Sequence, residues 1–397
     1  MRILVLTFYY KPDLSAGSFR TTVLVRSLLE AAPPGSTIDV LTTRPNRYRS
    51  FSADALETEH DGPLTVHRAA LPPHQSGLID QSRAFITFAR QAIALTRASR
   101  YDLVYATSSR LMTAALGALI APRVGGRLYL DIRDIFVDTI KDVAPRSIAW
   151  LMKPLFAIVE RWTLGRANKV NLVSRGFANY FTSRYPRQRF SYFTNGVDDE
   201  FVGQDAAALG IPVHRRPTDA PVTVVYAGNL GEGQGLHTIL PTLGLAMGKR
   251  VQFRIIGDGG RKAALATALE ARGVSNVELV PPIARDELIA AYRDADVLFL
   301  HLNDHDAFRK VLPSKLFEYA AMGKPIWAGV SGYAAEFIAA EVSNAAVFAP
   351  CDARDAERAF AELELADAPR TRFLERHARA RISREMAADV LGVGHEA

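Results

Sequence analysis

The sequence contains a single cysteine, Cys351, in 397 residues. One cysteine excludes an intrachain disulfide and leaves no cysteine cluster for zinc, as expected in a reducing compartment. The chain also lacks an apolar run of the roughly 20 residues that a bilayer span requires. The first ten residues, MRILVLTFYY, lack the basic leader and cleavage site of a signal peptide and predict a buried strand. We therefore expect a cytoplasmic protein that is not integral to a membrane.

Aromatic RNA-binding signatures, zinc fingers and basic low-complexity tails are also missing, so no nucleic-acid partner is expected. The formal charge of +6, from 48 basic and 42 acidic residues, still favours anionic partners such as phosphates or lipid head groups. Residues 85–100 and 148–166 mix bulky apolar with basic side chains, as helices on a membrane surface do. Core-facing amphipathic helices are the alternative. Peripheral attachment to the anionic inner face of the cell membrane is thus one hypothesis.

Short apolar strand patterns alternate with helical periodicity almost throughout, and they do so twice. This pattern predicts an α/β protein of two doubly wound, Rossmann-like domains whose sheets direct their carboxyl ends toward a central cleft. Gly, Pro and charged residues replace the apolar runs between residues 195 and 221, which predicts the linker. We assign 1–195 to the first, acceptor-binding domain and 196–377 to the second. Residues 371–393 read as one charged helix, and the segment 378–397 could pack back on the first domain.

Two glycine-rich turns follow strands of the second half. The segment YAGNLGEGQG (226–235) opens a helix near Leu236, and IIGDGG (255–260) forms the second turn. Glycines let the backbone approach a ligand closely, and a helix start offers N–H groups to phosphate. Ordinary strand-to-helix turns have the same composition. The donor-binding residues predicted here are Gly228, Asn229, Gln234, Gly257 and Asp258.

A third element, residues 312–323, follows the strand 297–301. Ser314 suits an N-cap and Gly323 a C-terminal stop, which places Glu318 about one turn into a helix. A carboxylate there can accept two hydrogen bonds from a ribose diol. The N–H groups at the helix start can face a diphosphate. We therefore predict donor binding by Leu312, Ser314, Lys315 and Glu318.

The run LPSKLFEYAAMGKPI (312–326), with NGVD at 195–198 and the two glycine turns, resembles the retaining glycosyltransferases of family 4 over nearly the whole chain. The resemblance implies the GT-B fold, retention of configuration, neither metal nor other cofactor, and a UDP- or GDP-sugar donor. The PSKxxEY variant, with DIRD at 131–134, resembles the branch found among bacterial O-antigen and capsule transferases, including amino-sugar transferases. We therefore predict a hexosyltransferase for lipopolysaccharide or related surface polysaccharides, with a UDP-sugar donor and a glycan or lipid-linked acceptor.

Two departures from the family pattern concern charge. Lys310 stands where the family often has a glutamate, and Asn229 and Gln234 stand where it often has an arginine and a lysine. The diphosphate then needs other cations, for which Lys310 is our first candidate, Lys315 the second and Arg261 a reserve. We list Ile283 and Leu316 as further donor-binding positions.

In the first half, the resemblance places the backbone of Gly17 against the diphosphate, while a flexible turn is the alternative. Charges concentrate at the carboxyl end of the strand 127–132, where a buried pair would be costly for structure alone. Arg133 aligns with a histidine of the family but cannot act as a base, so we assign it donor or acceptor binding. Asp134 or Asp138 would contact the acceptor hydroxyl, with a structural ion pair as the alternative. The predicted catalytic residues are Arg133, Asp134 and Lys310.

Other functions fit parts of this pattern. A UDP-sugar 2-epimerase shares the architecture, and a noncatalytic partner subunit of a transferase would bind the same nucleotide. A dinucleotide-dependent oxidoreductase is disfavoured because no strand is followed by a Gly-x-Gly-x-x-Gly turn.

Overall fold

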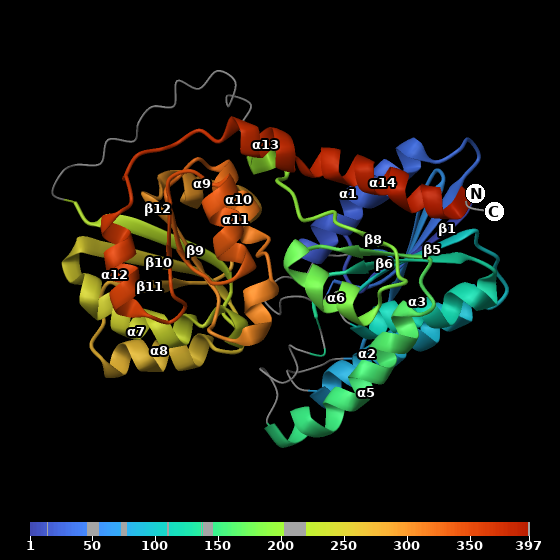
Figure 1. The fold of residues 1–397 in the computed structure, drawn as a ribbon, viewed down its shortest axis with the longest axis horizontal. Helices are drawn as coiled ribbons and strands as arrows, with labels where there is room; N and C mark the ends of the chain where they lie inside the picture. Colours follow the sequence, from blue (N-terminus) through green and yellow to red (C-terminus); the bar gives the residue numbers. More distant parts are fainter. Residues whose placement is uncertain are drawn as a thin grey trace. The chain divides into compact units, whose positions relative to one another are not determined.

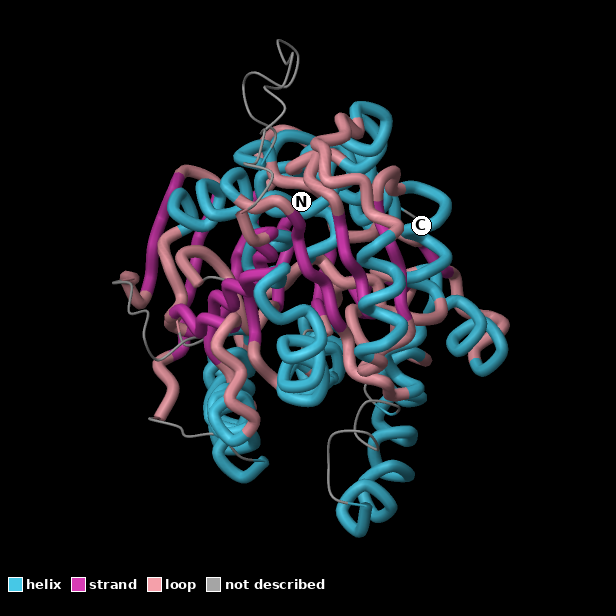
Figure 2. The backbone as a smooth tube through the Cα atoms, turned by 90° about the vertical axis from the view of Figure 1, so that its left-hand side faces the viewer, coloured by secondary structure: helices cyan, strands magenta, loops and turns pink. Residues whose placement is uncertain are grey.

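The computed structural model forms two compact units, each with one sheet between layers of helices (Figures 1 and 2). The described residues are 1–13, 15–45, 55–72, 78–108, 111–135, 137, 146–201 and 220–395. Unit 1 comprises Met1–Asn195 and Arg379–Ala397, and unit 2 comprises Gly196–Ala378. The prediction of two Rossmann-like α/β domains is confirmed.

Unit 1 contains an eight-stranded sheet in the order β3-β4-β2-β1-β5-β6-β7-β8. The strands are β1 (Arg2–Leu6), β2 (Thr37–Thr43), β3 (Thr58–Asp61), β4 (Leu64–Ala69), β5 (Leu103–Thr107), β6 (Arg127–Ile132), β7 (Lys169–Leu172) and β8 (Phe190–Ser191). All neighbours are parallel except β3 and β4. The strand order reverses between β1 and β5, which is where such sheets bind ligands.

Helices cover both faces of this sheet. They are α1 (Ala16–Ala31), α2 (Leu78–Thr96), α3 (Leu111–Val124), α5 (Arg146–Leu164), α6 (Ala178–Arg184) and α14 (Arg379–His395). Helices α1 and α14 pack together over alternate strand residues such as Ile3 and Val5. Helix α3 covers the opposite face, where Gly117 permits close approach because a Cβ there would meet the Ala106 Cβ at 2.5 Å. No helix among the described residues is long and apolar enough to cross a membrane.

Unit 2 contains a six-stranded parallel sheet in the order β11-β10-β9-β12-β13-β14. The strands are β9 (Val222–Asn229), β10 (Val251–Asp258), β11 (Val277–Val280), β12 (Val297–His301), β13 (Ile326–Gly329) and β14 (Ala345–Phe348). The helices are α7 (Leu236–Met247), α8 (Lys262–Ala271), α9 (Arg285–Asp294), α10 (Lys315–Ala321), α11 (Tyr333–Glu341), α12 (Ala353–Ala361) and α13 (Thr371–His377). An apolar core fills each face. The strand order of this sheet reverses between β9 and β12, as it does between β1 and β5 in unit 1.

Short 3-10 turns complete the two units, at Arg175–Phe177, Asp199–Phe201, Glu232–Gln234, Gly248–Arg250 and Asp306–Lys310.

The prediction of one helix over residues 371–393 is wrong, because the segment breaks between α13 and α14. Ala378 has a non-helical backbone with ψ of 123° and pairs with Val197, whose N–H donates to the His377 carbonyl at 2.8 Å. That pairing is incompatible with a continuous helix. As a result α13 belongs to unit 2, while α14 packs back on unit 1.

Candidate functional site

The loop after β9, residues 226–235 and here the glycine loop, is closed by two amide side chains. Asn229 Nδ2 donates a hydrogen bond to Gln234 Oε1 at 2.8 Å, and the same oxygen accepts from the Gly231 N–H at 3.3 Å. Tyr226 Oη donates to the Asn229 carbonyl at 2.7 Å. The two residues that replace the family's basic pair therefore bind each other and shape the loop. Direct contact of their side chains with a donor stays a prediction.

Bare backbone lies at the carboxyl ends of β9 and β10. Gly228 and Gly257 are register partners there, with φ of +142° and +148°. A Cβ on Gly257 would collide with the Gly228 carbonyl, so only glycine fits. In the turn that follows, Asp258 Oδ1 accepts a hydrogen bond from the Gly259 N–H at 2.8 Å. Asp258 thus stabilises the second turn, and the absence of side chains at the two glycines lets the backbone and the Lys315 side chain approach closely.

Two lysines bring positive charge to these turns. Lys315 begins α10, and a side chain on Gly228 would collide with its Nζ, which lies 5.4 Å from the centre of the Tyr226 ring. Lys262 Nζ donates to the Gly257 carbonyl at 3.2 Å. The sequence analysis named Lys315 but missed Lys262, whose position directly after the second turn was the available signal.

The remaining predicted cations have other surroundings. Arg261 forms an ion pair with Glu232 at 2.5 Å, so its charge is already compensated. Lys310 ends the 3-10 turn Asp306–Lys310, which precedes α10, and its side chain is half-buried. The geometry therefore places Lys315 beside the glycine loop, and the role of Lys310, the first candidate, stays a prediction.

Glu318 lies in the first turn of α10, where the sequence placed it, and is half-buried. Arg285 at the start of α9 pairs with Asp198 of the NGVD segment at 2.9 Å, and it also pairs with Glu200. Burial lowers the pKa of Arg285, but Asp198, Glu200 and the more distant Glu318 outweigh burial and raise that pKa. Arg285 therefore lies within electrostatic range of Glu318.

The start of α10 differs from the prediction in its capping. Ser314 occupies the N-cap position, but its side chain makes no capping hydrogen bond. The Leu316 N–H donates to the Pro313 carbonyl at 3.1 Å, so this amide is not free for phosphate. Leu312 and Leu316 are buried in the apolar core of unit 2, and Ile283 packs against that core. Their side chains stabilise the fold beneath the candidate site.

Unit 1 contains a buried ion pair that the sequence analysis did not identify. Arg20 of α1 donates from Nε and Nη2 to the two carboxylate oxygens of Asp131, at 2.9 and 3.0 Å. Tyr105 Oη and Asn171 Nδ2 donate to the same carboxylate at 2.9 and 2.7 Å. Burial would raise the pKa of Asp131, but Arg20, Arg133 and Asn171 lower it below its usual value. The available sequence signals were Asp131 at the end of a strand and one arginine among the buried residues of α1.

Arg133 and Gly17 lie side by side in unit 1. The Arg133 N–H donates to Ser108 Oγ at 3.0 Å, while its Nε and Nη1 are buried without a hydrogen-bond partner among the described residues. A Cβ on Gly17 would lie 2.6 Å from Nη1. Gly17 is in the first turn of α1, whose N-cap is Ser15. Because buried N–H groups without an acceptor are costly, an anionic oxygen is the ligand that Nε and Nη1 of Arg133 suit.

Of the two carboxylates predicted to bind the acceptor, the structure describes Asp134. Asp134 is an exposed residue, yet the surrounding protein raises its pKa to about 6, and Arg133 opposes that rise. Water reaches the exposed side chain and screens its charge, so this pKa shift does not translate into a contribution to the free energy of unfolding. Asp138 lies outside the described residues.

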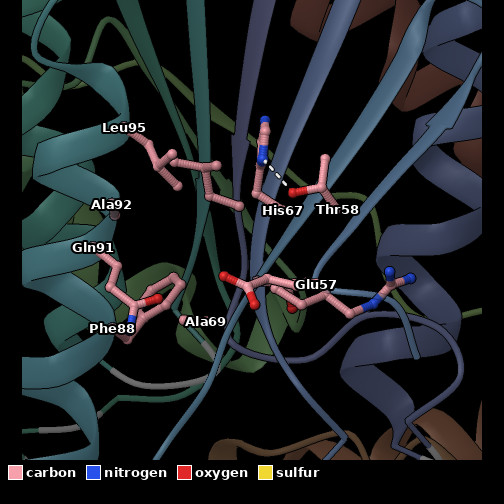
Figure 3. A pocket seen from close by; sticks show the side chains of 11 residues that line it. Glu57, Thr58, His67, Ala69, Phe88, Gln91, Ala92 and Leu95 are labelled. Atoms are coloured by element: carbon pink, nitrogen blue, oxygen red, sulfur yellow. Dashed lines mark hydrogen bonds between the residues drawn. The ribbon is translucent and has the colours of Figure 1, made fainter. Parts of the chain in front are cut away.

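A side cavity of about 60 Å³ lies in unit 1 between α2 and the strands β2 to β4 (Figure 3). Phe88, Ala92 and Leu95 line its helix side, and Thr58 and His67 line its sheet side. It has room for a few water molecules. No predicted site residue lines it, so the cavity is separate from the candidate site. No group of three or more His, Cys, Asp or Glu side chains in the described part of the chain is arranged to hold a metal.

Comparison with known proteins relates both units to sugar transferases. Residues 20–196 match the model of a glycosyl transferase 4-like domain, and residues 212–380 match that of glycosyl transferases group 1. WcaI of Escherichia coli (strain K12), named for glycosyl transfer in colanic acid biosynthesis, is 27% identical over 337 residues, which are 81% of this chain and 82% of that protein.

Solved structures share the fold over the full length. WaaG, a glycosyltransferase involved in lipopolysaccharide biosynthesis, has a TM-score of 0.59 at 13% identity, covering 99% of this chain and 97% of its own. HepE of Anabaena, in complex with UDP and glucose, has a TM-score of 0.59 at 15% identity, with the same coverage. The trehalose-phosphate synthase of Burkholderia xenovorans has a TM-score of 0.66 at 14% identity, covering 98% of this chain and 100% of its own.

Proposed function

Because the chain belongs to the glycosyltransferases of family 4, we propose that it transfers a hexose, with an N-acetylated amino sugar as one option, from UDP to a glycan or lipid-linked acceptor. We place this reaction in the synthesis of a bacterial surface polysaccharide, with retention and without a metal. The names of WcaI and WaaG support the pathway, and the UDP complex of HepE supports the nucleotide.

The observation that carries the proposal is the arrangement of polar groups around the glycine turns of unit 2. The diphosphate would lie against the bare backbone at Gly228 and Gly257, with Lys315 beside it. Glu318 in the following helix would accept hydrogen bonds from the ribose diol. Fixed peptide dipoles and an ammonium group would stabilise charge that develops on the leaving diphosphate.

In the proposed reaction, the acceptor hydroxyl oxygen forms a bond to the anomeric carbon on the face from which the diphosphate leaves. The bond from that carbon to the diphosphate oxygen breaks, and the hydroxyl proton passes to the departing UDP. Arg133, whose Nε and Nη1 are unpaired among the described residues, would bind an anionic oxygen of donor or acceptor. Asp134 would hold the acceptor hydroxyl, a role that we also assign to Asp138.

Peripheral membrane attachment is a further part of the proposal, supported by exposed apolar side chains. On α2, Ile86 and Leu95 are 54% and 49% exposed, and on α5, Leu155 and Ile158 are 52% and 66% exposed. Both helices pack against α3. Basic residues lie between these exposed apolar side chains, so the two helices should bind anionic lipid, and salt should weaken the binding. Failure to co-sediment with anionic vesicles at low salt would remove this part.

The proposed transfer is tested first by melting the protein with UDP-, GDP- and dTDP-sugars, since a ligand of the folded state raises the melting temperature. We expect the UDP series to give the largest shift. Transfer should persist in excess EDTA, and the product should keep the donor's anomeric configuration. Loss of activity on chelation that manganese restores would contradict metal independence. Isomerisation of the UDP-sugar without acceptor would instead identify an epimerase.

A further inference from the structure

His301 at the end of β12 lies between two backbone segments of unit 2. It is 1% exposed, its ring stacks on that of Phe299 at 6.0 Å, and it lies tilted against the ring of Phe348 at 5.9 Å. Its Nδ1 lies 2.6 Å from the Gln234 carbonyl of the glycine loop. The Cys351 N–H, after β14, donates to its Nε2 at 3.0 Å. One ring therefore connects the glycine loop to a segment more than 100 residues away.

The two partners determine the proton position on this ring. A carbonyl oxygen can only accept, so Nδ1 must carry the proton that bonds to Gln234. A peptide N–H can only donate, so Nε2 must be bare toward Cys351. Burial lowers the pKa of His301 to about 4, which keeps the ring neutral around pH 7. His301 is thus suited to structure and not to proton transfer.

Asn303, two residues further on, holds the neighbouring carbonyls of the same loop. Its Nδ2 donates to the Glu232 carbonyl at 2.9 Å, and its N–H donates to the Gly233 carbonyl at 2.9 Å. Together with the bond from His301, three successive carbonyls of the loop are bonded to the end of β12. Gly235 follows with φ of +61°, and a Cβ there would lie 3.0 Å from the Asn303 Cα.

Asn303 also contacts the segment after β14. Cys351 has φ of +63°, an unusual conformation for a residue with a side chain, and its Sγ lies 3.3 Å from Asn303 Oδ1. The His301 ring accepts from the N–H of the same cysteine. Two side chains from one strand end therefore fix both the glycine loop and this strained residue.

We infer that His301 and Asn303 are positioning residues that hold the glycine loop in its ligand-binding conformation. The inference rests on the proposed function in assigning the diphosphate to that loop. Three consecutive carbonyls bonded on one side leave the loop little freedom, so its peptide groups need not reorganise when a diphosphate binds. Loss of these bonds should weaken nucleotide binding even though both side chains are buried.

Three substitutions of His301 separate its two bonds. His301→Asn keeps a donor near Nδ1 for Gln234, His301→Gln keeps an acceptor near Nε2 for Cys351, and His301→Phe keeps only ring packing. We expect UDP affinity by calorimetry to fall about tenfold in His301→Phe and in His301→Gln. His301→Asn should recover most of that loss. Hydrogen exchange of the Gln234 and Gly235 amides in the free protein should be faster than wild type in His301→Phe and His301→Gln, and only slightly faster in His301→Asn.

Trp327→Phe is the matched control. Trp327 is buried in the same core, and its Nε1 donates to the Ala356 carbonyl at 3.0 Å, away from the glycine loop. This variant should lower the melting temperature while UDP affinity stays within twofold of wild type. Asn303→Ala should resemble His301→Phe in both affinity and exchange.

The inference fails if His301→Phe binds UDP as tightly as Trp327→Phe and its loop amides exchange at the wild-type rate. Absence of UDP binding by the wild-type protein would instead refute the proposed nucleotide. The exchange measurement needs no ligand, so it decides the positioning role in either case.

Discussion

The polar groups at the candidate sites of the two units are of different kinds. In unit 2 they are the peptide groups of Gly228 and Gly257, which carry no side chains and are register partners in neighbouring strands. In unit 1 the groups are charged side chains, arranged around the buried pair of Arg20 and Asp131. The site in unit 2 depends on backbone conformation, and the site in unit 1 depends on charge compensation. Substitutions of different kinds should therefore disable each.

Removing one charge of the buried pair should have the largest effect. Asp131→Asn leaves the Arg20 guanidinium buried without its counter-ion, which costs about 3–5 kcal/mol of unfolding free energy. The pKa of Asp131 is lowered in the folded protein, so its contribution is present above about pH 4 and is lost as pH falls below that. Denaturant unfolding at pH 7 measures the loss, and the acid limb of the wild-type stability curve should flatten in the variant.

The double variant Arg20→Met, Asp131→Leu tests whether charge is the cause. It removes both ions together, so at least half of the lost stability should return. Full recovery is not expected, because Tyr105 and Asn171 lose their acceptor. A double variant as unstable as Asp131→Asn would show that packing, not charge compensation, dominates in unit 1.

The corresponding change in unit 2 adds one methyl group. Gly257→Ala forces a side chain into φ of +148° and against the Gly228 carbonyl, which should cost about 3 kcal/mol or more. Gly260→Ala is the matched control in the same turn, since no atom lies within 4 Å of its Cβ position. We expect the control to unfold within about 1 kcal/mol of wild type and to bind UDP normally. Equal behaviour of the two variants would contradict the role of bare backbone.

The same contrast explains what could be predicted from sequence. The glycine turns and Glu318 belong to continuous strand-turn-helix segments, so their spacing alone located them. The pair of Arg20 and Asp131 joins positions 111 residues apart, and no local pattern records such a contact. The break at Ala378 was missed for the same reason, because it depends on pairing with Val197.

The positions of charged groups were harder to predict from sequence than the positions of the backbone turns. Lys310 was preferred because of its aligned position, and the structure adds that the Lys315 side chain reaches Gly228. Arg261, the reserve, is compensated by Glu232. A sequence gives the order of charged residues, while a long side chain can place its charge several ångströms from its Cα in more than one direction.

A smaller effect is expected from Glu318→Ala, which leaves backbone and buried charges intact. If the carboxylate binds the ribose, UDP binding should weaken by about 1.5–3 kcal/mol, the range for hydrogen bonds to a charged group. Calorimetry with UDP and with inorganic diphosphate separates the sites, since only UDP carries a ribose. Equal weakening for both ligands would assign Glu318 to the diphosphate, and unchanged affinity for UDP would remove its role.

The smallest effect is expected from removing single lysines of unit 2. It tests whether lysine side chains or peptide groups stabilise the leaving diphosphate. Lys315→Ala removes the ammonium beside Gly228, and charge on the leaving diphosphate grows toward the transition state, so turnover should fall more than UDP affinity. We expect about a tenfold lower kcat, or ~1.4 kcal/mol in barrier. Lys310→Ala, five residues earlier in the chain, should stay within about threefold of wild type. Steady-state release of UDP measures both variants under the same conditions. A large loss in Lys310→Ala alone would restore the assignment based on alignment, whereas near-wild-type turnover in both would mean that peptide groups stabilise the diphosphate without either lysine.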